Sequence, residues 1–378
     1  MTPPLSILQT CFSRSWGGLE IQALEVTAHL RERGHAVVLA CSAGSRLASE
    51  ARARSIPVIE CGVPGIRLPG AVWKISRYLR SHRTQIVHCQ HSGDLSAVVP
   101  AADISGTRPK ILLSKRVGSY VSKRDPFHRY TYSRVALVLA ISEVIHRNVL
   151  ETTPVSPERV VTLHDAIDAE EYSPGPDRGA RVRKEFGYTN EYVVVGFVGR
   201  FSPGKGHEEL LHAAAEVTGA RPHVRFLVAG EASAGEEAYE REIRNLCTSL
   251  GLDGVVRFAG FRRDIPDVMA SFDMLAFPSH AESFGVVLIE AMAMELPVVS
   301  TNCDGVVDIV VEGETGLYVH PRAPAELARA LIRLIDDHAL RIRFGEAGRR
   351  RVLELFDRRG QIDRLEGIYA GILAGGST

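Results

Sequence analysis

The sequence predicts an α/β protein with two doubly wound parallel sheets, each in a domain of its own. Three observations support this fold class. The chain has 378 residues, more than one hydrophobic core usually supports, so two domains of roughly 150 to 200 residues are expected. Short β-rich segments alternate with helix-length amphipathic segments, as in sheets with crossover helices. The alternation stops once, at residues 172–181 (YSPGPDRGAR), and then begins again.

The N-terminal half contains seven predicted strands with helices such as residues 19–34 between them. We assign residues 1–172 to this domain and residues 173–183 to a linker, and we expect a helix at about 358–378 to pack back on the domain. Ligands of such sheets bind at the carboxyl ends of the strands. The predicted strands are residues 5–10, 36–41, 57–61, 85–89, 110–114, 136–140 and 159–163.

The C-terminal half repeats the pattern over residues 184–357, which we assign to a second domain of the same kind. Its ligand side is also expected at the carboxyl ends of the strands, so that the two domains face each other across a cleft. The predicted strands are residues 192–200, 224–230, 254–260, 273–277, 297–300 and 316–319.

Composition excludes several protein classes. Lys and Arg together number 45, as do Asp and Glu, so the chain as a whole has no attraction for nucleic acid. The six cysteines are far apart and form no C-x-x-C pair, which predicts buried free thiols in a reducing cytoplasm. The N-terminus lacks the features of a signal peptide, and no run of about 18 apolar residues occurs. We therefore expect a cytoplasmic protein that does not span a membrane.

Charge is nevertheless uneven along the chain. From Arg67 to Arg134 there are 13 Lys and Arg against three Asp, a net charge of +10. Aromatic residues lie among these cations, which suggests contact with an anionic membrane surface or a phosphorylated glycolipid. The alternative is that the charges are scattered over solvated helix faces. No nucleic-acid-binding motif accompanies them.

Two carboxylates lie in an apolar segment, AESFGVVLIEAMAMELPVVST at residues 281–301. Residues 284–294 have the length and composition of a buried helix, with Glu282 just before it and Glu290 inside it. An unpaired charge on an apolar helix face costs several kcal/mol, roughly, so each needs a partner or a ligand. One alternative is that Glu290 pairs with a core arginine and that Glu282 caps the helix.

The segment GRFSPGKG, residues 199–206, follows a strand, precedes a helix and matches most of the phosphate-binding P-loop. Gly206 stands where that motif needs a Ser or Thr to bind magnesium, so a P-loop nucleotide hydrolase is disfavoured. Arg200 and Lys205 remain as two cations at the end of a strand, suited to a diphosphate. The alternative is a pair of solvated surface charges.

The region from about Val193 to Val319 resembles the donor-binding domain of glycosyltransferase family 4, whose members are retaining enzymes of the GT-B fold. The resemblance rests on the strand-RFSPGK-helix segment, the paired glutamates, PVVST, the turn at Gly305 and VEGETGLYV. WGGLE, VLAISEVI and VVTLHDAID extend it more loosely through the N-terminal half. It implies an enzyme that moves a sugar from a nucleotide-sugar.

The resemblance also implies roles for the residues singled out above. Glu282 binds hydroxyls of the donor sugar, and Glu290 binds the ribose of the nucleotide. Arg200 and Lys205 bind the phosphates in place of a metal ion, so no metal or other cofactor is expected. The residues at the opening of the following helix present backbone N–H groups to the donor; they are Ser283, Phe284, Gly285 and Val286. Arg262, in the loop at residues 260–264, is expected beside the base, with a surface turn as the alternative.

The N-terminal domain is expected to bind the acceptor. Gly17 and Gly18 open a helix after the first strand, where backbone N–H groups could meet a ligand, and Glu20 either orients that loop or completes the helix dipole. His88 and His91 end the fourth strand. By resemblance a histidine of this domain contacts the transferred sugar, and we choose His91; bonds to backbone are the alternative for both. Two histidines without a third ligand make a poor metal site.

Two positions depart from the family. Many relatives carry a histidine after the fifth strand, where this chain has Lys115 and Arg116. Either the sugar contact differs there, or a cationic acceptor group is bound. Asp165 and Ala166 replace a common Asn-Gly pair, which leaves any role of that turn open.

The sequence therefore predicts a metal-independent, retaining, front-face glycosyltransferase. Its donor is a nucleoside-diphosphate-sugar, with a UDP-sugar as first candidate and GDP- or ADP-sugars as alternatives. Its acceptor is a hydroxyl of a glycan or glycolipid, with or without a phosphate, and its location is the cytoplasm or the inner membrane face. The alternatives are a GT-B nucleotide-sugar epimerase and a non-catalytic nucleotide- or glycan-binding protein.

Overall fold

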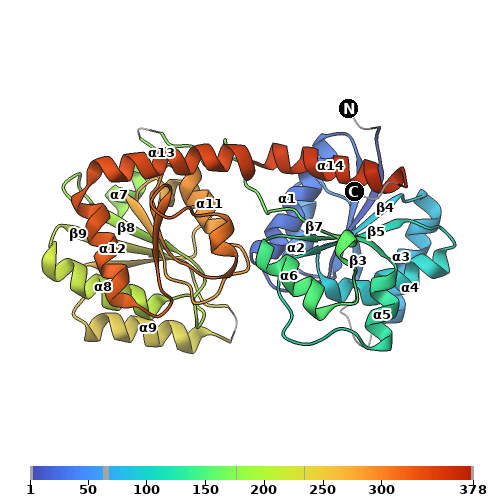
Figure 1. Cartoon of the computed structure of the whole chain (residues 1–378), viewed down its shortest axis with the longest axis horizontal. Helices are drawn as coiled ribbons and strands as arrows, with labels where there is room; N and C mark the ends of the chain where they lie inside the picture. The colour runs from blue at the N-terminus through green and yellow to red at the C-terminus, as the bar shows by residue number, and fades with distance from the viewer. Residues whose placement is uncertain (1–2, 63–67, 176, 234, 376–378) are drawn as a thin grey trace. The chain divides into compact units, whose positions relative to one another are not determined.

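The computed structural model describes residues 3–62, 68–175, 177–233 and 235–375, and the chain divides into two compact units (Figure 1). Unit 1 comprises Met1–Asp165 and Arg359–Thr378, and unit 2 comprises Ala166–Arg358. The first boundary therefore lies before residue 172, where the sequence analysis placed it. Part of the expected linker is helix α7 (Ala180–Glu185) of unit 2. Two residues of the sequence analysis, Arg67 in the basic region and Pro176 in the linker, lie outside the described residues.

Unit 1 contains a seven-stranded sheet in which every neighbouring pair is parallel, in the order β3-β2-β1-β4-β5-β6-β7. Ile7 of the central strand is opposite both Val37 and Ile86. All seven predicted strands are confirmed. They are β1 (Ser6–Cys11), β2 (Ala36–Ser42), β3 (Val58–Cys61), β4 (Ile86–Cys89), β5 (Lys110–Lys115), β6 (Val135–Ala140) and β7 (Val160–Thr162).

Helices connect these strands, and the C-terminal helix joins the same core. Ile362, Leu365 and Tyr369 of that helix are buried in one apolar cluster with Ile7 and Leu112 of the sheet. Helix α14 therefore supplies part of the unit 1 core from the far end of the chain. The helices are α1 (Gly18–Glu32), α2 (Arg46–Ala53), α3 (Leu68–His82), α4 (Leu95–Ser105), α5 (Pro126–Ser133), α6 (Glu143–Thr152) and α14 (Arg358–Leu373), with short 3-10 turns η1 (Ser92–Asp94) and η2 (Pro157–Arg159).

Unit 2 contains a six-stranded parallel sheet in the order β10-β9-β8-β11-β12-β13. The six predicted strands are likewise confirmed. They are β8 (Val193–Val198), β9 (Val224–Ala229), β10 (Val256–Gly260), β11 (Met274–Phe277), β12 (Val298–Thr301) and β13 (Gly316–Val319). Besides α7, the connecting elements are α8 (His207–Ala220), α9 (Glu237–Ser249), α10 (Ile265–Met269), α11 (Val286–Ala293), η3 (Asp304–Asp308), α12 (Pro324–Asp336) and α13 (His338–Leu355).

Both sheets have the strand order of the Rossmann fold, in which the chain starts in the middle and then reverses direction. The reversal lies between β1 and β4 in unit 1 and between β8 and β11 in unit 2. We call each of these two places the switch point of its sheet. The connections leaving these two strands diverge there, which opens a ligand site at the carboxyl edge. Ligand contacts are therefore expected from the segments after β1 and β4 in unit 1 and from the segments after β8 and β11 in unit 2.

The six cysteines are all buried with free thiols, as predicted. Across the described ranges, no helix combines the length and the apolar character needed to cross a bilayer.

Candidate functional site

The segment after β8 turns sharply on two glycines. Gly204 and Gly206 have φ values of +86° and +83°, a backbone region that residues with a side chain rarely adopt. A Cβ at Gly206 would lie 2.2 Å from the Pro278 carbonyl oxygen, so the backbone of the segment after β11 fills the space. A Ser or Thr does not fit at this position, which explains why the resemblance to a P-loop ends here.

The segment after β11 is held by backbone contacts to residues beyond β12. The Glu282 carbonyl accepts a hydrogen bond from Gly305 N at 2.9 Å, and its N–H donates to Asp304 Oδ2 at 3.2 Å. Gly285 has φ +106° and precedes α11, which starts without a side-chain cap. The N–H groups in the first turn of a helix have no partner within it, so this end of α11 suits an anion.

The two segments meet through Lys205 and Glu282. Lys205 Nζ lies 2.5 Å from Glu282 Oε2, and both side chains are largely but not fully buried. The alternative of Glu282 as a helix cap does not hold, because its carboxylate bonds Lys205. The switch point of the unit 2 sheet therefore carries a cation and a carboxylate side by side.

Arg200 lies in the same segment but turns toward other partners. Its Nε is 3.6 Å from Glu236 Oε2 and its Nη1 donates to Ser233 Oγ at 3.3 Å. Ser202 Oγ donates to the other oxygen of Glu236 at 2.6 Å. Half of the Arg200 side chain is exposed, so the guanidinium can turn to a ligand at small cost.

Glu290 projects from α11, and Tyr172 OH donates to its Oε1 at 3.0 Å. The pKa of the Glu290 carboxyl is raised to about 7, chiefly by burial and also by the nearby Glu171, while the Tyr172 bond acts to lower it. Among the described residues no ion pair joins Glu290 to an arginine, so the core-arginine alternative is not what the structure contains. The carboxyl is left with capacity to accept further hydrogen bonds.

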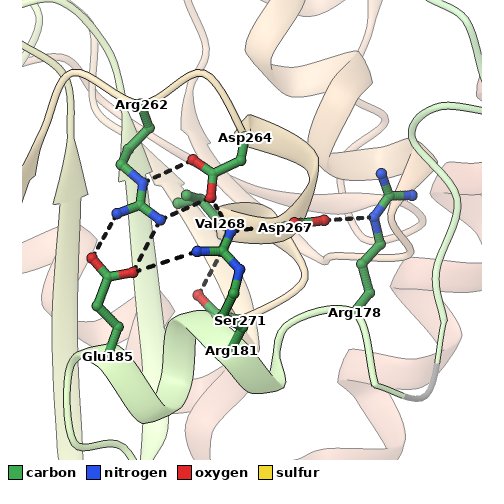
Figure 2. A network of polar contacts seen from close by, with 8 residues as sticks. All are labelled: Arg178, Arg181, Glu185, Arg262, Asp264, Asp267, Val268 and Ser271. Carbon is green, nitrogen blue, oxygen red and sulfur yellow. Dashed lines mark hydrogen bonds and ion pairs between the residues drawn. The ribbon is translucent and has the colours of Figure 1, made fainter.

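Arg262 is tied to neighbouring carboxylates (Figure 2). Its Nε and Nη2 donate to the two oxygens of Asp264 at 2.9 and 2.8 Å, and Nη1 and Nη2 donate to Glu185 at 2.6 and 3.1 Å. These bonds raise the pKa of Arg262 and lower that of Asp264 to about 2. Arg262 thus joins α7 to the segment after β10, which leaves few of its N–H groups for the base that we predicted it would contact.

At the unit 1 switch point, Gly17 immediately precedes α1 and its N–H donates to Glu20 Oε2 at 2.9 Å. Glu20 thus ties down the entry to α1. From the other side of the switch point, Asp94 accepts hydrogen bonds from Thr10 Oγ1 at 2.9 Å and Phe12 N at 3.2 Å. The segments after β1 and β4 are thereby fixed together.

The two histidines of this edge have different surroundings. His88 is buried, with Nδ1 2.7 Å from Tyr369 OH and Nε2 2.8 Å from Ser114 Oγ, and burial lowers its pKa to about 3. It is a neutral core residue. The His91 side chain is about half exposed, and its Nδ1 accepts from Gly93 N at 3.2 Å. Of the two, His91 is the one that can reach a ligand.

Two contacts at these edges could not be predicted from the sequence. Tyr172, the partner of Glu290, fell next to the expected linker, and nothing in the local pattern marks it. Arg116, which was counted in the basic region and noted where many relatives carry a histidine, is buried, and its Nε donates to both carboxylate oxygens of Asp165 at 3.1 Å. Asp165 thus has a structural role in the turn whose function was left open.

Two matches to known families cover most of the chain. Residues 16–171 match the family described as Glycosyltransferase Family 4, and residues 180–351 match the one described as Glycosyl transferases group 1. The D-inositol 3-phosphate glycosyltransferase of Corynebacterium efficiens is 40% identical over 195 residues, 50% of this chain and 46% of that protein. The alpha-D-kanosaminyltransferase of Streptomyces kanamyceticus is 29% identical over 247 residues, 65% and 62% of the two chains. This chain thus spans about half to two thirds of the length of these curated relatives.

Solved structures agree in fold. A glycosyltransferase from Rickettsia africae superposes with a TM-score of 0.89 at 22% identity, covering 98% of this chain and 99% of that one. Anabaena HepE in complex with UDP and glucose superposes with a TM-score of 0.84 at 24% identity, covering 97% and 99%. At these identities the likeness establishes the fold alone, and the predicted pair of Rossmann-like domains of the GT-B type is confirmed.

Proposed function

This chain belongs to glycosyltransferase family 4, and from that premise we propose that it transfers a sugar from a nucleoside-diphosphate-sugar to a hydroxyl group with retention of configuration and without a metal ion. The proposed donor is a UDP-sugar, and the proposed acceptor is a glycan or glycolipid. The observation that carries the proposal is the pairing of Lys205 with Glu282 at the unit 2 switch point, beside the uncapped start of α11.

The proposed donor site uses each of these groups for a separate part of the ligand. Lys205 and the first-turn N–H groups of α11 bind the diphosphate, and Arg200 turns in from the surface to join them. As the glycosidic bond breaks, these donors stabilise the charge on the departing nucleoside diphosphate. Held by Lys205, the Glu282 carboxylate accepts hydrogen bonds from sugar hydroxyls, and Glu290 accepts from those of the ribose.

Retention follows, in this proposal, from attack on the face that the leaving group vacates. The acceptor hydroxyl forms the new bond to the anomeric carbon as the bond to the diphosphate breaks, and a phosphate oxygen takes the hydroxyl proton. No enzymatic nucleophile is required, and His91 is the proposed contact to the transferred sugar from unit 1. Measuring the anomeric configuration of the product by NMR tests retention directly.

The proposed membrane contact rests on the segment at residues 117–130. Its exposed apolar side chains are Val117, Tyr120, Val121, Phe127 and Tyr130, and Arg124 and Arg129 are exposed among them. Apolar side chains that insert at an interface and cations that attract anionic lipids together favour membrane binding. Co-sedimentation with phosphatidylglycerol vesicles, compared with phosphatidylcholine vesicles, tests this; equal binding of wild type and a Tyr120→Ser, Val121→Ser variant would contradict it.

Two further observations concern the nature of the acceptor. The relatives named D-inositol 3-phosphate glycosyltransferases act, by their name, on a phosphorylated polyol. The described part of unit 1 also contains cations at the carboxyl edge of its own sheet. Both support an acceptor that bears a phosphate.

A thermal-shift screen against UDP, GDP, ADP and their sugar conjugates, in buffer with EDTA, tests the proposed function first. A ligand that binds only the folded state raises the melting temperature, and we expect UDP and one UDP-sugar to do so. Acceptor-dependent release of UDP then establishes transfer. Donor consumption without an acceptor would indicate an epimerase, binding without turnover a non-catalytic protein, and a shift that needs magnesium would contradict the donor site.

A further inference from the structure

A small cavity of about 140 Å³ lies at the carboxyl ends of β4 and β5 in unit 1. A water molecule takes up about 30 Å³ in the liquid, so the cavity has room for a group of several heavy atoms. The polar residues that line it include Lys115, Lys123, Arg116, Ser92 and Ser114. It adjoins His91 and therefore belongs to the switch-point edge at which this fold binds ligands.

The charges around the cavity do not balance. Arg116 is neutralised by Asp165, to which it makes three contacts of 3.0 to 3.1 Å, and it also donates to Gln90 Oε1 at 2.5 Å. Lys123 Nζ donates to the neutral Ser92 Oγ at 3.3 Å, and its side chain also interacts with that of Lys115. Among the described residues neither Lys115 nor Lys123 makes an ion pair, so two ammonium groups line the cavity without a carboxylate partner.

Lys115 is the more unusual of the two because only 5% of it is exposed. Lysine is almost never buried unless it is paired, since an isolated charge loses its hydration. Burial and the neighbouring Lys123 lower the pKa of Lys115 to about 8, and burial lowers that of Lys123. The site therefore stores an unfavourable charge interaction that an anion would relieve. The same two ammonium groups would repel a cationic acceptor group, which disfavours that alternative.

We propose that Lys115 and Lys123 bind a phosphate group of the acceptor in this cavity. A phosphate monoester carries a charge close to −2 at pH 7 and so matches both ammonium groups, whereas a carboxylate would match only one. Lysine ammonium groups suit several phosphate oxygens as compact point charges, and the Ser92 and Ser114 hydroxyls can donate as well. The assignment to the acceptor rests on the proposed function, in which Arg200 and Lys205 of unit 2 bind the donor diphosphate. The binding of phosphate itself does not depend on it.

Calorimetric titration of the full chain with glycerol 3-phosphate and with inorganic phosphate tests the site, in the presence of saturating UDP to occupy the donor cations. Lys115→Met and Lys123→Met are compared with Lys110→Met, a matched control that removes an exposed lysine from the other end of β5. We expect wild type and the control to bind equally. Each cavity variant should bind about 30-fold more weakly, as for loss of one partner of a buried charge pair.

A second readout distinguishes a ligand site from a structural lysine. In phosphate-free buffer Lys115→Met should melt at a higher temperature than wild type, because it removes an unpaired buried charge. Added glycerol 3-phosphate should raise the melting temperature of wild type and not that of the variant. A Lys115→Met protein whose melting temperature rises with glycerol 3-phosphate as much as that of wild type would overturn the inference. Should Lys115→Met fail to fold, the Lys123→Met variant, which changes an only partly buried residue, decides the question in the titration.

The remaining outcomes separate this inference from the proposed function. Failure of wild type to bind either phosphate compound, while UDP still raises its melting temperature, overturns the cavity site and leaves the donor site standing. Lysine-dependent phosphate binding without any effect of UDP supports the cavity and contradicts the donor site. Vesicles containing phosphatidic acid that compete with glycerol 3-phosphate indicate a lipid headgroup as a source of the phosphate. Absence of competition assigns the site to soluble esters.

Discussion

Lys205 Nζ and Glu282 Oε2 are 2.5 Å apart, although 77 residues separate them in the chain. The pair joins the segment after β8 to the segment after β11 at the point where the unit 2 sheet reverses its strand order. It brings a group that attracts phosphate next to one that accepts from hydroxyls, which is the combination that the proposed nucleotide-sugar donor requires.

Replacing Glu282 tests its proposed contact with the donor sugar. Glu282→Gln keeps the shape of the side chain but weakens it as an acceptor, and we expect kcat for sugar transfer to fall about a hundredfold with little change in melting temperature. The control Glu314→Gln removes an exposed carboxylate in the turn before β13 and should retain full activity. Full transfer by Glu282→Gln and by Glu282→Ala would show that the sugar is bound elsewhere.

A double-mutant cycle measures the coupling of Lys205 and Glu282. Because both side chains retain some exposure, we expect the free energies of unfolding of Lys205→Met and Glu282→Gln to be non-additive by about 0.5 to 1 kcal/mol. Urea unfolding of the four proteins gives this value. Strict additivity would mean that the pair contributes nothing to the folded state.

The pKa of Glu290 predicts a pH dependence of stability. The pKa is about 7 in the folded chain against an ordinary value of 4.5, so the folded state favours the protonated carboxyl. The stabilisation that this provides is complete below about pH 4.5 and is lost as the pH rises through 7. Between about pH 4.5 and 7, the unfolding free energy of wild type should therefore fall relative to that of Glu290→Gln. A flat difference would contradict the raised pKa.

The same group predicts how donor binding varies with pH. An ionised carboxylate accepts ribose hydroxyls better than a protonated one, so affinity for a UDP-sugar should rise as the pH passes through about 7. A UDP-sugar is a diphosphate diester, so its phosphates stay fully ionised over this range. Titration calorimetry between roughly pH 6 and 8 should show this rise in affinity for wild type. The affinity of Glu290→Gln should stay constant over the same range.

Gly204 and Gly206, in the turn before α8, share a positive φ but differ in the space around them, so their alanine variants can be compared directly. A Cβ at Gly204 would have only His280 Nδ1 nearby, at 4.0 Å, so Gly204→Ala should cost about 1 kcal/mol from its positive φ alone. Gly206→Ala has the same strain and also a backbone clash with Pro278, so it should cost more than about 2 kcal/mol and weaken UDP binding. Equal effects of the two changes on thermal unfolding would argue against the close approach.

The hydrogen bond between Tyr369 OH and His88 Nδ1 ties helix α14 to the unit 1 sheet. Both residues are buried, so Tyr369→Phe leaves His88 Nδ1 without its partner and should cost about 1 to 3 kcal/mol in unfolding free energy. The control Tyr130→Phe removes an exposed hydroxyl bonded to Asp103 and should cost less than that. A neutral Tyr369→Phe variant would mean that apolar packing alone holds the helix.

Sequence alone determined the architecture and marked Lys205 and Glu282 separately as candidate site residues, without predicting that the two meet. The seven and six strands follow from the local alternation of apolar runs. Lys205 was singled out by its place in the P-loop-like turn after a strand, and Glu282 as a carboxylate in an otherwise apolar segment. These features are local, since hydrophobic periodicity and turn-forming residues act over a few positions.

Only the tertiary structure decided which charges are paired and which are buried without a partner. Arg262 is engaged by Glu185, Arg116 is neutralised by Asp165, and Glu290 meets Tyr172 rather than an arginine. The sequence places Lys115 after the fifth strand but does not show that it is buried beside Lys123. The physical reason is that desolvation and ion pairing depend on contacts between segments far apart in the chain, which local patterns do not encode.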